Sequence, residues 1–136
     1  MPAGTAPTKP ARAAEEDRVL VFGCGGRRLA LGLRHVAGLV EAGRPVPVPL
    51  APDFVVGLLD RRGSVLAVLD LSRLLGHEGG PVAPFVVRLA APWDHVALRV
   101  AEPVRLVPPA DREGAEILDP NALLALAQSA LPAGRI

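Results

Sequence analysis

The sequence has 136 residues, and its formal net charge at pH 7 is +1. This length predicts one domain, or two very small ones that share a core. The balanced charge gives no general attraction to nucleic acid or membranes, and an aromatic content of 3% argues against a base-stacking surface.

The single cysteine, Cys24, excludes an internal disulfide and is typical of a reducing compartment. No stretch reaches the roughly 18 apolar residues that a membrane-spanning helix needs. The N-terminus also lacks the basic start and apolar run of a signal peptide. These features predict a cytoplasmic protein that does not insert into a membrane and does not bind nucleic acid.

Residues 1–17 are rich in Pro, Ala and Thr, and we expect them to be a disordered tail. Strand-forming residues at Val19–Cys24 and Leu29–Leu33 flank Gly25-Gly26, which predicts a β-hairpin. A further strand is expected at Val36–Val40. Residues 44–52 hold four prolines, which favour an edge strand or an extended connector.

Residues 57–76 predict a strand, a turn, a second strand and a short helix. The first strand runs over Phe54–Asp60, and the turn is Asp60-Arg61-Arg62-Gly63. Val65–Leu69 is a continuous apolar run, so we expect it to be buried on both faces. Asp70 is a good N-cap for a helix with a leucine stripe that Gly76 ends.

The second half repeats this order after a linker at residues 77–84. Strands are predicted at Phe85–Ala90, Val96–Val100 and Val104–Val107. Asp119-Pro120 then combines an N-cap with a proline in the first helical turn, which predicts a helix to about Gln128. Residues 129–136 are expected to form a C-terminal tail.

The two halves align with each other as an internal repeat. At an offset of 67 positions the apolar strand residues Val19, Leu20, Phe22, Leu29, Leu31, Leu33 and Val40 align with Val86, Val87, Leu89, Val96, Leu98, Val100 and Val107. Leu69-Asp70 aligns with Leu118-Asp119 at an offset of 49, so the second copy is 18 positions shorter (67 − 49). Coincidence among apolar strands is the alternative explanation. If the repeat is real, it predicts two small packed β-barrels, the second lacking a strand or more.

The segment from Pro49 to Leu71 resembles the CheW family, the adaptors that couple chemoreceptors to the CheA histidine kinase. Gly57, Arg62, Gly63 and Asp70-Leu71 stand at key positions of the family's pattern. Weaker similarity covers Val19–Phe22 with Leu29–Leu39, and Val96–Val107. On this basis the chain is identified as a short, divergent member of the CheW family over about residues 18–128.

The resemblance implies a mostly β fold of two packed SH3-like barrels, one at about 18–76 and a shortened one at about 85–128. It implies short helices after Asp70 and Asp119. It also implies a non-catalytic scaffold that binds the cytoplasmic tip of chemoreceptors and modulates their coupling to a CheA-type kinase in receptor arrays. The family's receptor-coupling arginine corresponds to Arg62.

The sequence departs from the family at several positions. Asp60-Arg61 replaces the family's Asn-Leu, Gly38 replaces a glutamate, and the second half is short. We therefore favour receptor binding over kinase binding. Another CheW-like protein is an alternative binding partner.

The candidate partner-binding residues are Arg62, Val36, Leu39, Arg61, Asp60 and Gly63. An arginine at a turn can anchor a partner through its guanidinium, although a merely solvated turn charge is the alternative for Arg62. Val36 and Leu39 fit an apolar groove or ordinary core packing equally well. Gly57, Asp70 and Asp119 are interpreted as structural: a backbone device and two helix caps.

The histidines, His35, His77 and His95, are scattered, and no metal-binding or catalytic spacing accompanies them. We therefore predict no enzyme, no metal and no cofactor. A small β-barrel module that binds a ligand or associates with an enzyme is the alternative function, and it would require a concave pocket with convergent polar groups.

Overall fold

The computed structural model describes residues 18–78, 81–112 and 114–130. The proposed tail at 1–17 and residues 131–136 lie outside this part of the chain. The strands are β1 (Val19–Cys24), β2 (Arg27–Gly32), β3 (Val36–Glu41), β4 (Val55–Arg61), β5 (Ser64–Asp70), β6 (Val82–Leu89), β7 (Val96–Val107) and β8 (Glu116–Ile117). The helices are η1 (Leu33–His35), α2 (Leu71–Leu74), η2 (Pro109–Asp111) and α3 (Pro120–Ser129).

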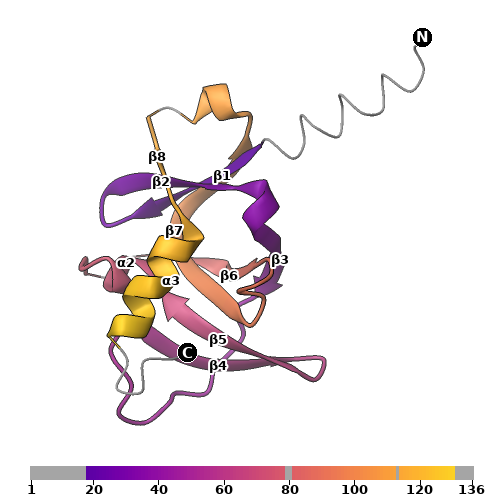
Figure 1. Cartoon of the computed structure of the whole chain (residues 1–136), viewed down its shortest axis with the longest axis vertical. Coiled ribbons are helices and arrows are strands. Elements are labelled where there is room, and N and C mark those ends of the chain that lie inside the picture. The colour runs from indigo at the N-terminus through magenta and orange to yellow at the C-terminus, as the bar shows by residue number, and fades with distance from the viewer. Residues whose placement is uncertain (1–17, 79–80, 113, 131–136) are drawn as a thin grey trace, which may run out of the picture.

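These strands form one strongly curved sheet. Its main path is β3-β6-β7-β1-β2-β8, and β5 joins β7 while β4 joins β5. Figure 1 shows β1, β2 and β8 in the upper part of the molecule, with β4 and β5 in the lower part and α3 in front. The predicted β-rich fold and both predicted helices, capped by Asp70 and Asp119, are confirmed.

The strand register repeats with the offsets found in the sequence. Val40 of β3 pairs with Val86 of β6, and the equivalent residue Val107 of β7 pairs with Val19 of β1. In the same way, β5 runs parallel to β7, and β8 runs parallel to β2. Each copy therefore completes its sheet with strands of the other copy.

The buried residues repeat as well. One small cluster is formed by Leu59, Leu66, Val68, Val86 and Ala97, with Val40, Ala42 and Val56 against it. A second cluster is formed by Val19, Val21, Ala30 and Ala115, with Val107 against it. Four members of the second cluster stand at positions equivalent to Val86, Ala97, Leu66 and Val40 of the first.

No residue of the second cluster is equivalent to Val56 or Leu59, which the first cluster receives from β4. In the described residues between β7 and β8, η2 is the one regular element. The main core is the largest of the three clusters, and α3 contributes Leu123, Leu124 and Ala127 to it. Whether these halves constitute two SH3-like barrels, the second truncated, stays a prediction.

Two predicted element boundaries in the second half were wrong, both near prolines. Val96–Val100 and Val104–Val107 are one strand, β7, and β6 begins at Val82 instead of Phe85. Pro103 and Pro84 lie where the register of their strands shifts, so their missing N–H groups break no regular ladder.

The prediction that Val65–Leu69 is buried on both faces was also wrong, because Val65 is 55% exposed. Successive side chains of β5 point to opposite faces of the sheet. Near the turn the side chains on one face are buried, whereas those on the other face are exposed to solvent. A continuous apolar run in the sequence does not show where that cover ends.

The proline-rich segment 44–52 is an extended connector that meets β4 at one residue. Val46 and Leu58 exchange two backbone hydrogen bonds, with N···O distances of 2.7 and 2.8 Å. The connector passes so close to Gly57 that a Cβ there would lie 2.4 Å from the Val46 carbonyl oxygen. Gly57 also has a φ of 151°, which L side chains rarely adopt.

We therefore expect Gly57→Ala to lower the free energy of unfolding by about 1–3 kcal/mol, because it adds strain and displaces the connector. Chemical denaturation measures this change. Gly38→Ala is the matched control, since a Cβ at Gly38 meets nothing within 4 Å. Equal stability of the two variants would contradict this account of Gly57.

Candidate partner-binding surface

Arg62 lies in a tight turn at the end of the β4–β5 hairpin. Arg61 pairs with Ser64, which leaves Arg62 and Gly63 as the two turn residues. Their φ angles are 52° and 85°, the pattern of a type I′ turn. Asn and Gly are the usual residues at such positions, and a bulky L residue there costs about 1–2 kcal/mol. The chain thus holds an exposed arginine where local energetics disfavour it.

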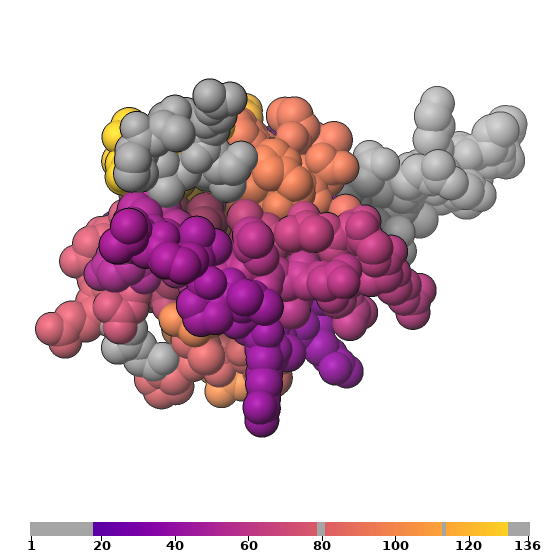
Figure 2. All heavy atoms as spheres, turned by 90° about the horizontal axis from the view of Figure 1, so that it is seen from below, coloured from indigo at the N-terminus to yellow at the C-terminus, as the bar shows by residue number. Residues whose placement is uncertain are grey.

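The outer face of this hairpin is partly apolar. Pairing places Leu58 opposite Ala67 and Asp60 opposite Val65, on the face opposite the buried pair Leu59–Leu66. Leu58 is 41% exposed and Val65 is 55% exposed. We call Leu58, Asp60, Arg62, Gly63 and Val65 the hairpin surface. In Figures 1 and 2 the hairpin extends toward the right of the described residues, and in Figure 1 the proline-rich connector runs at the lower left, away from the turn.

The structure separates the two predicted arginines. Arg61 shares the inward face of Leu59 and is half-buried, whereas Arg62 is exposed in the turn. In the described part of the chain, no ion pair or hydrogen bond engages the Arg62 side chain. Its guanidinium is therefore available to a partner.

Val36 and Leu39 lie on the same face of β3 even though they are three positions apart. A bulge between Val36 and Gly38 sets Val36 opposite Leu89 and Leu39 opposite Val87, two residues that share one face of β6. Val36 packs against the main core, while Leu39 is 51% exposed. Strand β3 pairs with β6 and not with the β4–β5 hairpin, so no pairing joins these residues to Arg62.

The exposed aliphatic residues next to Arg62 were not predicted from the sequence. Leu58 and Val65 flank the turn on its outer face, and Val46 of the connector, 66% exposed, adjoins Leu58. The short loop between two apolar runs contained the signal, because a two-residue turn fixes which residues face outward. The turn was predicted to be two residues longer than it is, and with that turn length the outward-facing residues of the two strands could not be identified.

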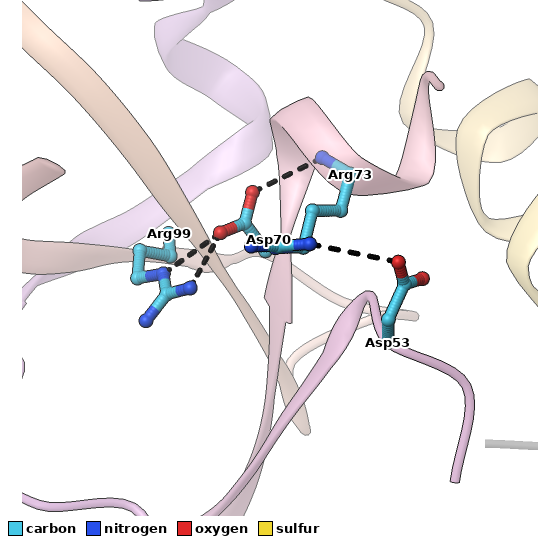
Figure 3. Close-up of polar contacts among 4 residues, drawn as sticks. All are labelled: Asp53, Asp70, Arg73 and Arg99. Carbon is cyan, nitrogen blue, oxygen red and sulfur yellow. Dashed lines mark hydrogen bonds and ion pairs between the residues drawn. The ribbon is translucent and has the colours of Figure 1, made fainter. Parts of the chain in front are cut away.

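Asp70 fastens the hairpin to the rest of the sheet (Figure 3). Its Oδ2 accepts hydrogen bonds from Arg99 Nε at 3.0 Å and Nη2 at 2.5 Å, and its Oδ1 accepts one from the backbone N of Arg73 at 3.1 Å. The residue is 2% exposed. Arg73 Nη1 in turn lies 3.6 Å from Oδ2 of Asp53, which directly follows the proline-rich connector. The carboxylate thus caps α2 and also links β5 to β7.

Asp119 repeats the cap without the ion pair. Its carboxylate accepts a hydrogen bond from the backbone N of Asn121 at 3.1 Å. Gly32 occupies the position equivalent to Arg99, so the second copy has no guanidinium there. Asn121 also accepts a hydrogen bond from the Trp93 indole at 2.8 Å, which ties α3 to the loop between β6 and β7.

No three His, Cys, Asp or Glu side chains among the described residues are grouped so as to hold a metal ion. Cys24 is buried, and burial raises the pKa of its thiol, although a hydrogen bond with Ser72 acts in the opposite direction. Among the helices described, none has the length and apolar character needed to cross a membrane.

A family model for the CheW-like domain matches residues 18–122, which include every strand and the start of α3. The chain belongs to the CheW-like family. This family comprises adaptor and scaffold domains of chemotaxis signalling. The hairpin surface, β3 and the Asp70–Arg99 pair all lie within the matched CheW-like region.

Two curated relatives match part of this CheW-like chain. The protein FrzA of Myxococcus xanthus is 35% identical over 74 residues, which cover 54% of this chain and 46% of FrzA. The chemotaxis protein CheW of Thermotoga maritima is 32% identical over 66 residues, which cover 48% of this chain and 44% of that protein. The match therefore spans less than half the length of either relative.

A solved structure shares the CheW-like fold. The scaffolding protein TtCheW from Thermoanaerobacter tengcongensis superposes with a TM-score of 0.60 at 20% sequence identity. The superposition covers 68% of this chain and 65% of TtCheW. At this identity the likeness establishes the fold.

We expect Asp70→Ala to lower the free energy of unfolding by about 2–4 kcal/mol, because α2 loses its cap and Arg99 loses its buried carboxylate. Asp119→Ala removes a cap alone and should cost about 1 kcal/mol. Urea denaturation of both variants measures the difference. Equal losses would show that the Arg99 pair adds nothing to stability.

The thiol of Cys24 should react slowly with a disulfide reagent such as DTNB in the folded protein. Burial keeps the thiol neutral and out of reach, so we expect a rate roughly a hundredfold lower than in urea-unfolded protein. Absorbance of the released thiolate follows the reaction. An immediate stoichiometric reaction of the folded protein would contradict the buried position.

Proposed function

We propose that this CheW-like protein is a non-catalytic adaptor that binds the cytoplasmic tip of chemoreceptors and modulates their coupling to a CheA-type histidine kinase. The observation that carries the proposal is Arg62, an exposed guanidinium that pairs with no described residue and is held at a positive φ in the hairpin turn. Backbone strain retained at an exposed residue is typical of functional sites, where the side chain matters more than local stability.

The surroundings of Arg62 suit a protein partner. Its guanidinium can form two parallel hydrogen bonds with a carboxylate, and Leu58 and Val65 offer aliphatic area beside it. Arginine is among the residues that are enriched where most of the binding energy of protein interfaces is concentrated. We include Leu39 of β3 in the proposed receptor-binding residues because its aliphatic side chain is also exposed. Val36, on the same face of β3, packs against the main core and would contribute by holding that strand in place.

We propose a weakened or lost interaction with the kinase. The support is the asymmetry of the repeat, since the second buried cluster has no counterpart of Val56 and Leu59 from β4. On this interpretation the molecule consists of two SH3-like barrels, the second incomplete, and a surface present in a complete second barrel is missing. Such a protein would occupy receptors in cytoplasmic arrays, alone or beside another CheW-like protein, without recruiting kinase.

The substitution Arg62→Asn separates stability from binding. Asparagine suits the type I′ turn, so the free energy of unfolding should rise by about 1 kcal/mol. The affinity for a receptor cytoplasmic tip should fall about tenfold or more, because the guanidinium is lost. Calorimetric titration and urea denaturation provide the two values, with Arg18→Ala as a control that removes an exposed arginine elsewhere.

An unchanged affinity of Arg62→Asn would remove Arg62 from the receptor site. The kinase proposal is tested separately by titration with the regulatory domain of a CheA-type kinase. We expect no saturable binding at concentrations that saturate the receptor tip. Tight binding of the kinase domain would overturn that part of the proposal and leave the receptor part standing.

A further inference from the structure

Strand β8 is the last strand on the path of the sheet, and no described strand pairs with its outer edge. Leu118 N donates a hydrogen bond of 2.7 Å to the Ala30 carbonyl of β2. Alternate residues of a strand face opposite sides, so the N–H and C=O of Ile117 point away from β2. No strand of the described chain pairs with that side of β8, and Figure 1 shows β8 at the outer side of the upper part.

The first copy shows what normally occupies this edge. Val68 of β5 stands at the position equivalent to Ile117, and it pairs with Gly57 of β4. The backbone N of Asp70 donates to the Phe54 carbonyl at 2.7 Å. The backbone N of the equivalent residue, Asp119, donates no such hydrogen bond to a carbonyl of the described residues.

The side chains beside β8 are correspondingly uncovered. Ile117 shares the face of Ala30 in the second buried cluster, yet it is 52% exposed, whereas its counterpart Val68 is fully buried. Two hollows, of about 230 and 150 Å3, adjoin the strand, and Ile117 and Leu118 line both. An aliphatic side chain equivalent to Leu59 would fill the open side of the cluster.

The described sheet also ends at β3 and at β4, and the edge at β4 is protected. In the connector beside β4, Pro45, Pro47 and Pro49 alternate with residues that have a backbone N–H group to donate. Prolines lack this N–H group, so they hinder the pairing of a further strand at an edge. Strand β8 has no proline or lysine, and its one charge, Glu116, is already paired with Arg27. Natural sheets usually block exposed edges, and the two-residue length of β8 is the one protective device at this edge in the described chain.

We propose that the outer edge of β8 binds an extended strand of another protein, with aliphatic residues at alternating positions like those of β4. The incoming strand would exchange backbone hydrogen bonds with Ile117 and bury an aliphatic side chain against Ala115 and Ile117. This site is separate from the hairpin surface and does not depend on receptor binding.

A labelled peptide with the sequence of residues 53–62, which contains β4, is the probe. In ¹⁵N-edited NMR of the full chain we expect saturable shifts at Ala115, Ile117 and Asp119, and a rise in fluorescence anisotropy of the label. Ile117→Pro removes the outward N–H but leaves the Leu118 bond to β2, and it should weaken binding at least tenfold. A scrambled peptide should not bind.

Ile117→Lys and Leu126→Ser keep the experiment decisive if the proline variant unfolds. Ile117→Lys keeps the backbone donor, removes the aliphatic cover and should also weaken binding, whereas Leu126→Ser changes a comparably exposed leucine, 47%, on α3 and should not. Arg62→Asn should bind the peptide normally. Absence of binding to the folded wild type, or binding of both Ile117 variants as tight as that of the wild type, would overturn the proposal.

The same samples distinguish a second copy from another protein as the occupant. Sedimentation equilibrium should give a monomer for the wild type. A concentration-dependent dimer that Ile117→Pro converts to a monomer would overturn the choice of occupant, because a second copy would then fill the edge.

Discussion

Strand β7 joins all parts of the sheet. Its first half pairs with β6 on one side and with β5 on the other, and its second half pairs with β1. The Asp70–Arg99 ion pair fixes the parallel β5–β7 contact where it meets α2. The hairpin that carries Arg62 is therefore held by a buried carboxylate at its far end, while its turn is free to meet a partner.

The interlaced pairing explains why the two copies cannot be treated as independent domains. The third strand of each copy pairs with the first strand of the other, so neither small cluster is complete without both halves. The difference between the copies is then concentrated in one place. Strand β4 covers β5 in the first copy, and the described residues supply no such strand to β8.

Much of this arrangement could be predicted from the sequence because the signals were local. Gly25-Gly26 marks a two-residue turn, and Asp70 and Asp119 mark helix starts. The turn at Arg62-Gly63 was predicted at the right place but two residues too long. The repeat offsets even matched the strand register. Proline misled the prediction at Pro84 and Pro103, since a proline at a register shift is compatible with a continuous strand.

The site was harder to predict than the fold. Family resemblance selected Arg62, but the exposed neighbours Leu58 and Val65 depend on which face of the hairpin the core covers, and that is a tertiary property. The bulge that brings Val36 and Leu39 to one face was likewise invisible in a run of alternating residues. The strain at Arg62 could not be read without the backbone. The shortened repeat did predict that the second half lacks a strand and leaves an edge, but the sequence did not show that this edge belongs to β8.

The account depends most on the hairpin surface being the receptor site. The most direct measurement is an NMR titration of the ¹⁵N-labelled chain with a receptor cytoplasmic tip, followed residue by residue. We predict the largest shifts at Arg62, Gly63 and Val65. Shifts confined to α3 and β8, with the hairpin unaffected, would contradict it.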